Sequence, residues 1–203
     1  MNIKNLTLLL FVMILFITMT SCDTSKQQAS NLNAGFWQEF IKAFNEKKPL
    51  EINKYINSNY GFFVIDNPGA FLIVKHFYSF NEIMGMEGEF DIAYLKVLKV
   101  DCDLRDGKRP YYNCDYDENG WDKEGCFLEK SPKFKISEEY KNMIGYELVD
   151  SNIVKDEMIL SKKSDSIITH LVYNTEATVG FYFGKINNRW YLLCIDKVTP
   201  CDA

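Results

Sequence analysis

An acidic stretch in the second half of the chain holds residues spaced as ligands for a hard metal ion. Asp115, Asp117 and Asn119 carry side-chain oxygens at alternate positions, and Gly120 follows them directly. Oxygen ligands at this spacing wrap around one ion when the chain turns tightly, and a glycine permits that turn. The chemistry that this pattern suggests is calcium binding.

The stretch resembles the first half of the calcium loop of EF-hand proteins, with Asp115 at the first position. The second half departs from that pattern, because Cys126 stands at the twelfth position, where a bidentate glutamate is expected. Asp122 or Glu124 would replace that ligand only in a different geometry. The alternative is a solvated acidic turn held by cysteines, and calcium is the one cofactor that the sequence suggests.

Two histidines, His76 and His170, could transfer a proton at neutral pH. His76 lies in an apolar run, and His170 shares an alternating segment with Ile168 and Val172. Neither has a nearby histidine or cysteine that would complete a zinc motif. The sequence also contains no nucleophile elbow, zinc-protease helix, phosphate loop or dinucleotide fingerprint. Structural histidines account for this pattern, and we identify no catalytic set.

The start of the chain has the features of an export signal. Lys4 precedes a 14-residue, largely apolar run at 6–19, which is short for a membrane-spanning helix and typical of a signal peptide. The run ends in Met19-Thr20-Ser21-Cys22, which resembles the lipobox of bacterial lipoproteins, although Met19 replaces the usual leucine. The resemblance implies cleavage before Cys22 and acylation of this cysteine with chains such as palmitate. An ordinary signal peptide with an incidental cysteine is the alternative.

Three parts of the chain follow from this interpretation. Residues 1–21 form the signal peptide, residues 22–33 are a polar tether that begins with the acylated Cys22, and residues 34–203 form one domain. Asp23 resembles an inner-membrane retention signal of some enteric bacteria, but the sequence does not decide between attachment to the inner and to the outer membrane. The formal net charge of −5 argues against nucleic acid as a partner.

Five further cysteines lie in an exported chain, where an oxidising compartment favours disulfides. We expect up to two bonds and one remaining thiol. Proximity in sequence favours Cys114 with Cys126 and Cys194 with Cys201. Three of the five cysteines lie at 101–130, an acidic excursion rich in turn-forming residues. Its aromatic residues either stack on a sugar or partner, or bury the excursion against a sheet; they are Tyr111, Tyr112, Tyr116 and Trp121.

Apolar spacing predicts the elements that would position these residues. It indicates a helical hairpin at 36–44 and 49–56, a short strand at 61–65 and a half-buried strand at 90–100. Residues 71–80 fit either a strand or a helix, and Ser137 is expected to cap a short helix that ends at Gly145. The segment 166–173 leads into a β-hairpin at 177–195, with Asn187 and Asn188 at its turn. If Ile186 pairs with Arg189, then Phe181, Phe183 and Lys185 share a face with Cys194, Leu192 and Trp190.

Together these elements predict an α+β fold, with an N-terminal helical hairpin packed on a curved, mostly antiparallel sheet that ends in a long C-terminal hairpin. The helix that begins with Phe36-Trp37 and the closing segment around Trp190-Tyr191 resemble the cone-shaped folds of the nuclear transport factor two-like and cystatin-like group. That resemblance implies a pocket between helix and sheet. It assigns no functional residue, because the group has many unrelated functions.

The leading hypothesis is a non-enzymatic, lipid-anchored lipoprotein of the cell envelope, with its domain outside the cytoplasm. It would be held to a membrane through Cys22 and would bind a small ligand or an envelope protein. One alternative is an enzyme of the same fold that uses a buried acid with His76 or His170. Another is a calcium-stabilised assembly protein that docks through the acidic excursion.

Overall fold

The computed structural model describes residues 32–68, 71–86, 91–115, 120–198 and 200–201, without the side chains of 91–93. The chain divides into two compact units, Met1–Asn33 and Ala34–Ala203. Of the first unit only Leu32 and Asn33 are described, so the predicted signal peptide, Cys22 and Asp23 lie outside the described residues. The architecture below is that of the second unit.

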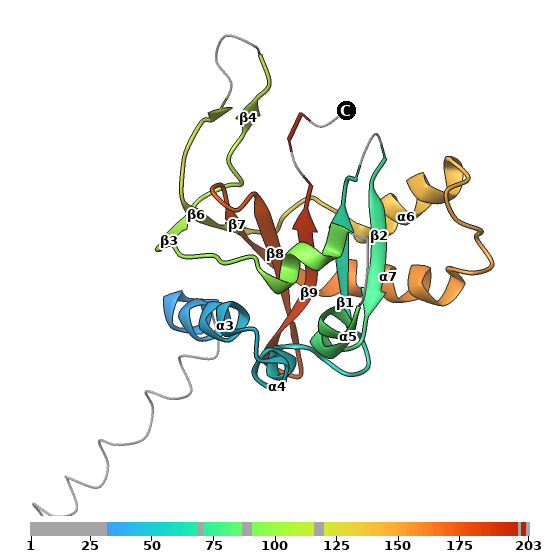
Figure 1. Ribbon diagram of the computed structural model, residues 1–203, viewed down its shortest axis with the longest axis horizontal. Coiled ribbons are helices and arrows are strands. Elements are labelled where there is room, and N and C mark those ends of the chain that lie inside the picture. The colour runs from blue at the N-terminus through green and yellow to red at the C-terminus, as the bar shows by residue number, and fades with distance from the viewer. Residues whose placement is uncertain (1–31, 69–70, 87–90, 116–119, 199, 202–203) are drawn as a thin grey trace, which may run out of the picture. The chain divides into compact units, whose positions relative to one another are not determined.

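Helices and strands alternate irregularly along this unit (Figure 1). The helical elements, including two short 3-10 helices (η), are α3 (Ala34–Glu46), α4 (Pro49–Ile52), η1 (Asn53–Tyr55), α5 (Phe80–Gly85), η2 (Asp91–Lys96), α6 (Ile136–Gly145) and α7 (Lys155–Ile167). The strands are β1 (Phe62–Asp66), β2 (Ile73–Phe77), β3 (Leu104–Asp106), β4 (Tyr112–Asn113), β5 (Gly120–Trp121), β6 (Cys126–Lys130), β7 (Ile168–Asn174), β8 (Val179–Ile186) and β9 (Arg189–Lys197).

Seven strands form one sheet in the order β2-β1-β9-β8-β7-β6-β3. Neighbouring strands are antiparallel except for β1 with β9 and β3 with β6, which are parallel. Strands β4 and β5 form a separate pair within the excursion. The predicted α+β class is confirmed, with the N-terminal helices packed on a mostly antiparallel sheet that ends in the β8–β9 hairpin.

Helix α3 covers one face of the sheet with aromatic side chains. Trp37, Phe40 and Phe44 are fully buried, as are Phe181 and Phe183 of β8. Ring centroids across this interface lie 5.1–5.7 Å apart, in tilted or edge-to-face arrangements that aromatic pairs favour. The rings contact one another directly, so this part of the interface between helix and sheet is packed.

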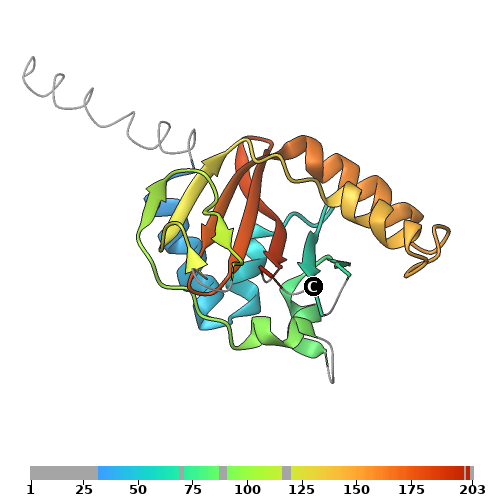
Figure 2. The same cartoon turned by 90° about the horizontal axis from the view of Figure 1, so that it is seen from above.

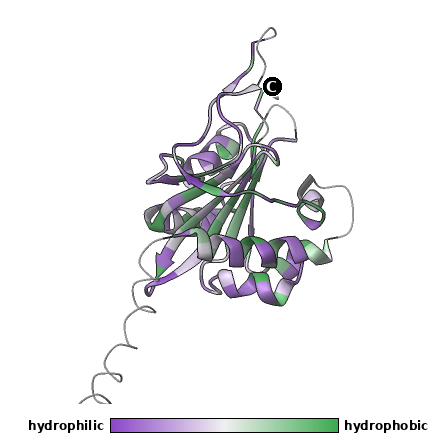
Figure 3. Ribbon diagram, turned by 90° about the vertical axis from the view of Figure 1, so that its left-hand side faces the viewer, coloured by the Kyte–Doolittle hydropathy of each residue, from purple (hydrophilic) through white to green (hydrophobic). Residues whose placement is uncertain are grey.

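Helices α6 and α7 lie on the opposite side of the strands from α3 (Figure 2). Tyr140 of α6 packs in the same buried cluster as Phe63, Tyr173 and Tyr182 of the sheet. The strands are apolar between helices that carry polar outer faces (Figure 3). Helix α7 was not predicted, because its buried side chains are Ser161 and Ser164 and it shows no apolar stripe.

The β8–β9 hairpin confirms the predicted turn and much of the register. Asn187 and Asn188 both have positive φ, and Ile186 pairs with Arg189 as expected. A bulge follows: Phe183 still pairs with Leu192, but Tyr182 pairs with Cys194. The extra residue shifts Cys194 to the opposite face, where it packs with Tyr182. The prediction that Cys194 shares a face with Phe181 and Phe183 is therefore wrong.

Two other local predictions are wrong. A strand was predicted at 90–100, but the described part of this segment, residues 91–100, contains no strand. Tyr94 O accepts hydrogen bonds from the amides of Val97 (3.0 Å) and Leu98 (2.8 Å), so this segment turns on itself and contains η2. Helix α6 begins at Ile136, so Ser137 lies within its first turn. Asp165 of α7 caps this helix instead, because its carboxylate accepts the amides of Ile136 (2.8 Å) and Ser137 (3.1 Å).

Candidate functional site

Two disulfides fasten the acidic excursion, and neither is one of the predicted pairs. Cys102 bonds Cys126, and Cys114 bonds Cys201, each with Cα atoms 5.8 Å apart. Cys194 is a free, buried thiol. Sequence proximity failed because Cys194 lies in the middle of the sheet, whereas Cys201 follows the end of β9 and meets the excursion. Burial of Cys194 and its proximity to two carboxylates raise the pKa of its thiol, so it is chemically inert in the fold.

A buried ion pair joins the excursion to the sheet. Nη1 of Arg109 lies 2.9 Å from Oδ2 of Asp196 in β9, and Asp196 is almost completely buried. The guanidinium also lies 4.3 Å above the ring of Tyr173. The hydroxyl of Tyr182 is 3.5 Å from the same carboxylate oxygen. The charge of Asp196 is thus matched by one cation and surrounded by rings.

The electrostatics of this cluster are those of a structural ion pair. Burial lowers the pKa of Arg109, but Asp196 together with Tyr173 and Tyr182 outweighs that effect, and the net pKa is raised. Burial and the charge of Asp196 raise the pKa of Tyr182, and burial raises the pKa of Tyr173 to about 12. All three side chains therefore keep their ordinary protonation states near neutral pH. The buried acid is used to hold the excursion in place.

The two histidines have structural partners. Nε2 of His76 lies 2.7 Å from the carbonyl oxygen of Tyr60, which only accepts, so this nitrogen carries the proton. The His76 ring also packs 4.6 Å from Phe63. His170 Nδ1 lies 2.9 Å from Thr169 Oγ1, and its ring meets that of Trp190 edge-on at 4.8 Å. Neither histidine lines either of the two grooves described below.

The predicted calcium ligands are only partly described. Asp115 is exposed, and its backbone amide donates to Asn113 Oδ1 (3.1 Å). Asp117 and Asn119 lie outside the described residues. Asp122, considered as a substitute ligand, accepts the amide of Tyr111 instead (2.7 Å). Within the part of the chain that the structure describes, no three histidine, cysteine or acidic side chains come close enough to hold a metal ion.

The aromatic residues of the excursion serve mainly to bury it. Trp121 packs edge-on against Tyr173 of the sheet at 5.4 Å and against Tyr112 at 4.8 Å. Tyr111 is exposed, and Tyr116 lies outside the described residues. The rings were expected either to stack on a sugar or partner or to bury the excursion. For Tyr112 and Trp121 the structure supports burial against the sheet.

An open groove of about 530 Å³ runs beside the Cys102–Cys126 disulfide. Acidic side chains dominate its walls, with Arg105 as the counter-charge; they are Asp101, Asp103, Glu124 and Glu176. The amide of Asn174 forms its floor and donates to the sulfurs of Cys102 (3.2 Å) and Cys126 (3.3 Å). The polar groups of this floor are thus already hydrogen-bonded within the protein.

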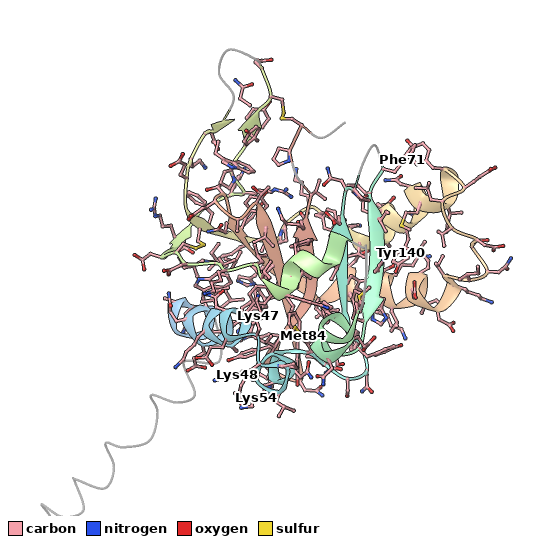
Figure 4. All side chains as sticks on the ribbon, viewed as in Figure 1. Lys47, Lys48, Lys54, Phe71, Met84 and Tyr140 are labelled. Atoms are coloured by element: carbon pink, nitrogen blue, oxygen red, sulfur yellow. A yellow bond between two sulfur atoms is a disulfide. The ribbon has the colours of Figure 1, made fainter. Side chains whose placement is uncertain are left out.

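Exposed apolar side chains gather at the connection between α6 and α7. Phe71, Tyr146, Leu148 and Ile153 are 43%, 62%, 45% and 78% exposed, and we call these four residues the apolar tip. The rings of Phe71 and Tyr146 are 4.8 Å apart. Phe71 lies where the chain enters β2, beside α6 (Figure 4). Sequence reasoning missed this surface, because only the fold brings residue 71 next to residues 146–153.

No family model, curated protein or solved structure matches this chain. Among the described residues, the helices are all too short or too polar to cross a lipid bilayer. The functional assignment therefore depends on the residues themselves.

Proposed function

We propose that this chain is a lipid-anchored protein of the bacterial cell envelope that binds a protein partner and catalyses no reaction. Two independent features support the location. The segment Met19-Thr20-Ser21-Cys22 follows an apolar run and resembles a lipobox. Four of the five remaining cysteines form two disulfides, which persist in oxidising compartments.

Acylation of Cys22 would supply the membrane attachment. Each buried CH₂ of an acyl chain contributes about 0.8 kcal/mol, and a single chain binds only reversibly, so stable attachment needs two or more chains. The modified cysteine of a lipoprotein carries that number. The domain then needs no spanning helix of its own.

The apolar tip is the observation that carries the proposal of partner binding. Phe71 and Tyr146 form an exposed pair with rings 4.8 Å apart, and Leu148 and Ile153 are exposed further along the connection between α6 and α7. Contiguous exposed apolar surface marks interaction sites in soluble domains. Acidic side chains at Glu147, Asp150 and Asp156 surround the connection, which favours a partner with basic residues at its rim.

The hydrogen bonds, ring contacts and ion pair made by the titratable side chains support binding over catalysis. His76 and His170 are held by hydrogen bonds and ring contacts, and neither opens into a described groove. The buried acid Asp196 is neutralised by Arg109. A proton-transfer site would instead pair such an acid with a histidine in an accessible cavity.

The anchor is tested by metabolic labelling with a palmitate analogue in a bacterium that processes lipoproteins. The wild-type chain is expected to incorporate label and to partition into the detergent phase. The Cys22→Ser chain should lose both properties while keeping the same melting temperature. A Cys22→Ser chain that still partitions with membranes would overturn the assignment.

The surface is tested by placing a photo-crosslinking amino acid at Ile153 in the full chain. A matched control carries it at Leu50, which is equally exposed at 79% but lies on α4. We expect the amino acid at position 153 to form an adduct with a partner protein, and the crosslinked peptide of that partner to contain basic residues. The adduct should no longer form when Glu147 and Asp150 are changed to lysine. Equal capture from both positions, or capture that survives the charge reversal, would contradict the proposal.

A further inference from the structure

A second groove, of about 640 Å³, is lined by residues at the end of β3 and of β6 and in the segments that follow them, and its lining is rich in lysine. Lys108 comes from the segment after β3, Lys130 ends β6, and Lys133 lies in the connection to α6. We call this surface the lysine groove. Two segments that are separate in sequence, one at Lys108 and one at Lys130 and Lys133, thus place three lysines around one concave surface.

These ammonium groups are available for a ligand. All three lysines are exposed, and none forms an ion pair or hydrogen bond with a residue that the structure describes. Two carboxylates also line the groove. Glu129 is held by the backbone amide of Arg109, which donates to its Oε2 at 2.9 Å. Three lysines against these two carboxylates leave the lining with a formal net positive charge.

His170 lies beside the lysine groove and is sensitive to its charges. It pairs with Lys130 across β6 and β7. Burial lowers the pKa of His170, and the charges of Lys130 and Lys185 lower it further, while Asp106 acts in the opposite direction. A positive charge on this ring is therefore disfavoured, as expected where cations are in excess.

We propose that the lysine groove binds phosphate-bearing anions. Lysine ammoniums in excess over carboxylates on a concave surface are a common way to hold phosphate, for which lysine acts as a point charge. The chain as a whole is acidic, so this groove is a local exception to its net charge. The inference concerns the domain alone and holds whether or not Cys22 is acylated.

The test uses the two histidines as built-in probes, because the chain contains no others. Imidazole resonances of the mature Cys22→Ser chain are followed by NMR from pH 5 to 8, in inorganic phosphate and in sodium chloride of equal ionic strength. An anion beside Lys130 offsets its repulsion, so the pKa of His170 should rise by about 0.5 or more in phosphate. His76, at the opposite side of the sheet, is the internal reference.

The variant Lys108→Gln/Lys130→Gln/Lys133→Gln removes the groove charges. In this variant the pKa of His170 should already be raised, and phosphate should add nothing. The matched control, Lys42→Gln/Lys162→Gln/Lys163→Gln, changes the net charge equally at exposed lysines outside the groove. It should respond to phosphate as the wild type does, and equal melting temperatures verify that all three proteins are folded.

Vesicles distinguish the two sources of phosphate. The ligand is a lipid head group if the Cys22→Ser chain sediments with phosphatidylglycerol vesicles but not with phosphatidylcholine vesicles. The groove variant should then sediment with neither. If only inorganic phosphate acts, the ligand is a soluble phosphate compound. Equal effects of phosphate and chloride, a response that survives in the groove variant, or no response at all would each overturn the proposal.

Discussion

Nη1 of Arg109 lies 2.9 Å from Oδ2 of Asp196, a residue 87 positions further along the chain. The disulfide between Cys114 and Cys201 has the same separation of 87. The excursion is therefore joined to the end of the chain twice with the same offset, by an ion pair at Arg109 and by a covalent bond at Cys114. This arrangement fixes the excursion to the last strand of the sheet.

Replacing Arg109 with methionine leaves Asp196 buried without a counter-charge. We expect a loss of about 3 kcal/mol in the free energy of unfolding, measured by urea denaturation of the oxidised Cys22→Ser protein. The double variant Arg109→Met/Asp196→Leu should recover most of that loss, because no charge is then left buried. The exposed Arg105→Met is the control and should cost less than 1 kcal/mol. A small effect of Arg109→Met alone would show that water already reaches Asp196.

Peptide mapping without reduction should recover Cys102 linked to Cys126 and Cys114 linked to Cys201, with Cys194 unmodified until the protein is denatured. Each disulfide stabilises the fold by lowering the entropy of the unfolded chain, and a larger closed loop gives a larger effect. The upper values are about 4–5 kcal/mol for the second, larger loop and about 3–4 kcal/mol for the first. The serine pair Cys114→Ser/Cys201→Ser should therefore lower stability more than Cys102→Ser/Cys126→Ser. The reverse order, or a Cys194 that reacts in the folded state, would contradict the arrangement.

Asp165 stabilises α6 from a neighbouring helix by accepting two of its first amides. Asp165→Ala should destabilise the protein by about 1–2 kcal/mol, since both amides lose their acceptor. Asp165→Asn keeps one acceptor oxygen and should cost less. Asp156→Ala changes an exposed acid of the same helix and should cost about 0.5 kcal/mol or less. Thermal unfolding of the four proteins gives the comparison, and equal effects of the two alanine variants would rule out capping by Asp165.

Lys47 places an ammonium 3.6 Å above the ring of Phe44 at the end of α3, and its Nζ has no hydrogen-bond partner among the described residues (Figure 4). Burial, aided by Lys99, lowers the pKa of Lys47 to about 8. The folded protein therefore holds this proton less tightly than the unfolded chain, where the lysine pKa is about 10.4. Below pH 8 the charge destabilises the fold, and stability should rise as the pH increases from about 8 to about 10.4.

Lys47→Met should remove this pH-dependent gain and stabilise the protein by about 1 kcal/mol at pH 7, after allowance for partial exposure and the lost ring contact. Denaturation curves at pH 7, 8.5 and 10 for the variant and the wild type measure the difference. Lys48→Met, at an exposed site paired with Glu46, is the control and should run parallel to the wild type. Parallel curves for Lys47→Met as well would show that its ammonium is solvated.

Local patterns were sufficient for the parts of the fold that depend on short-range chemistry. The apolar stripe of α3 and the Asn187-Asn188 turn each determine an element within a dozen residues, and both were predicted. The bulge at Leu193 was not, because it depends on how β9 fits between two neighbours. Helix α7 escaped prediction because it faces the core with small polar side chains.

The candidate surfaces were harder to predict than the fold. The lysine groove combines Lys108 with Lys130 and Lys133, more than 20 residues away, and the apolar tip combines Phe71 with Tyr146, about 75 residues away. The disulfides show the same limit, since Cys114 is close to Cys126 in sequence but pairs with Cys201. Proximity that arises only after the sheet has formed has no local signature.

The central position of β9 also dictates an order of assembly. In the described sheet, the β1–β2 hairpin reaches the other strands solely through its parallel contact with β9, the last strand in sequence. A chain that leaves a ribosome or translocon amino end first presents Phe62 and Phe63 long before their neighbour emerges. Strand β2 can cover one edge of β1 early, but the other edge stays without its partner strand, so the nascent protein is a natural client for holding chaperones until residues 189–197 arrive.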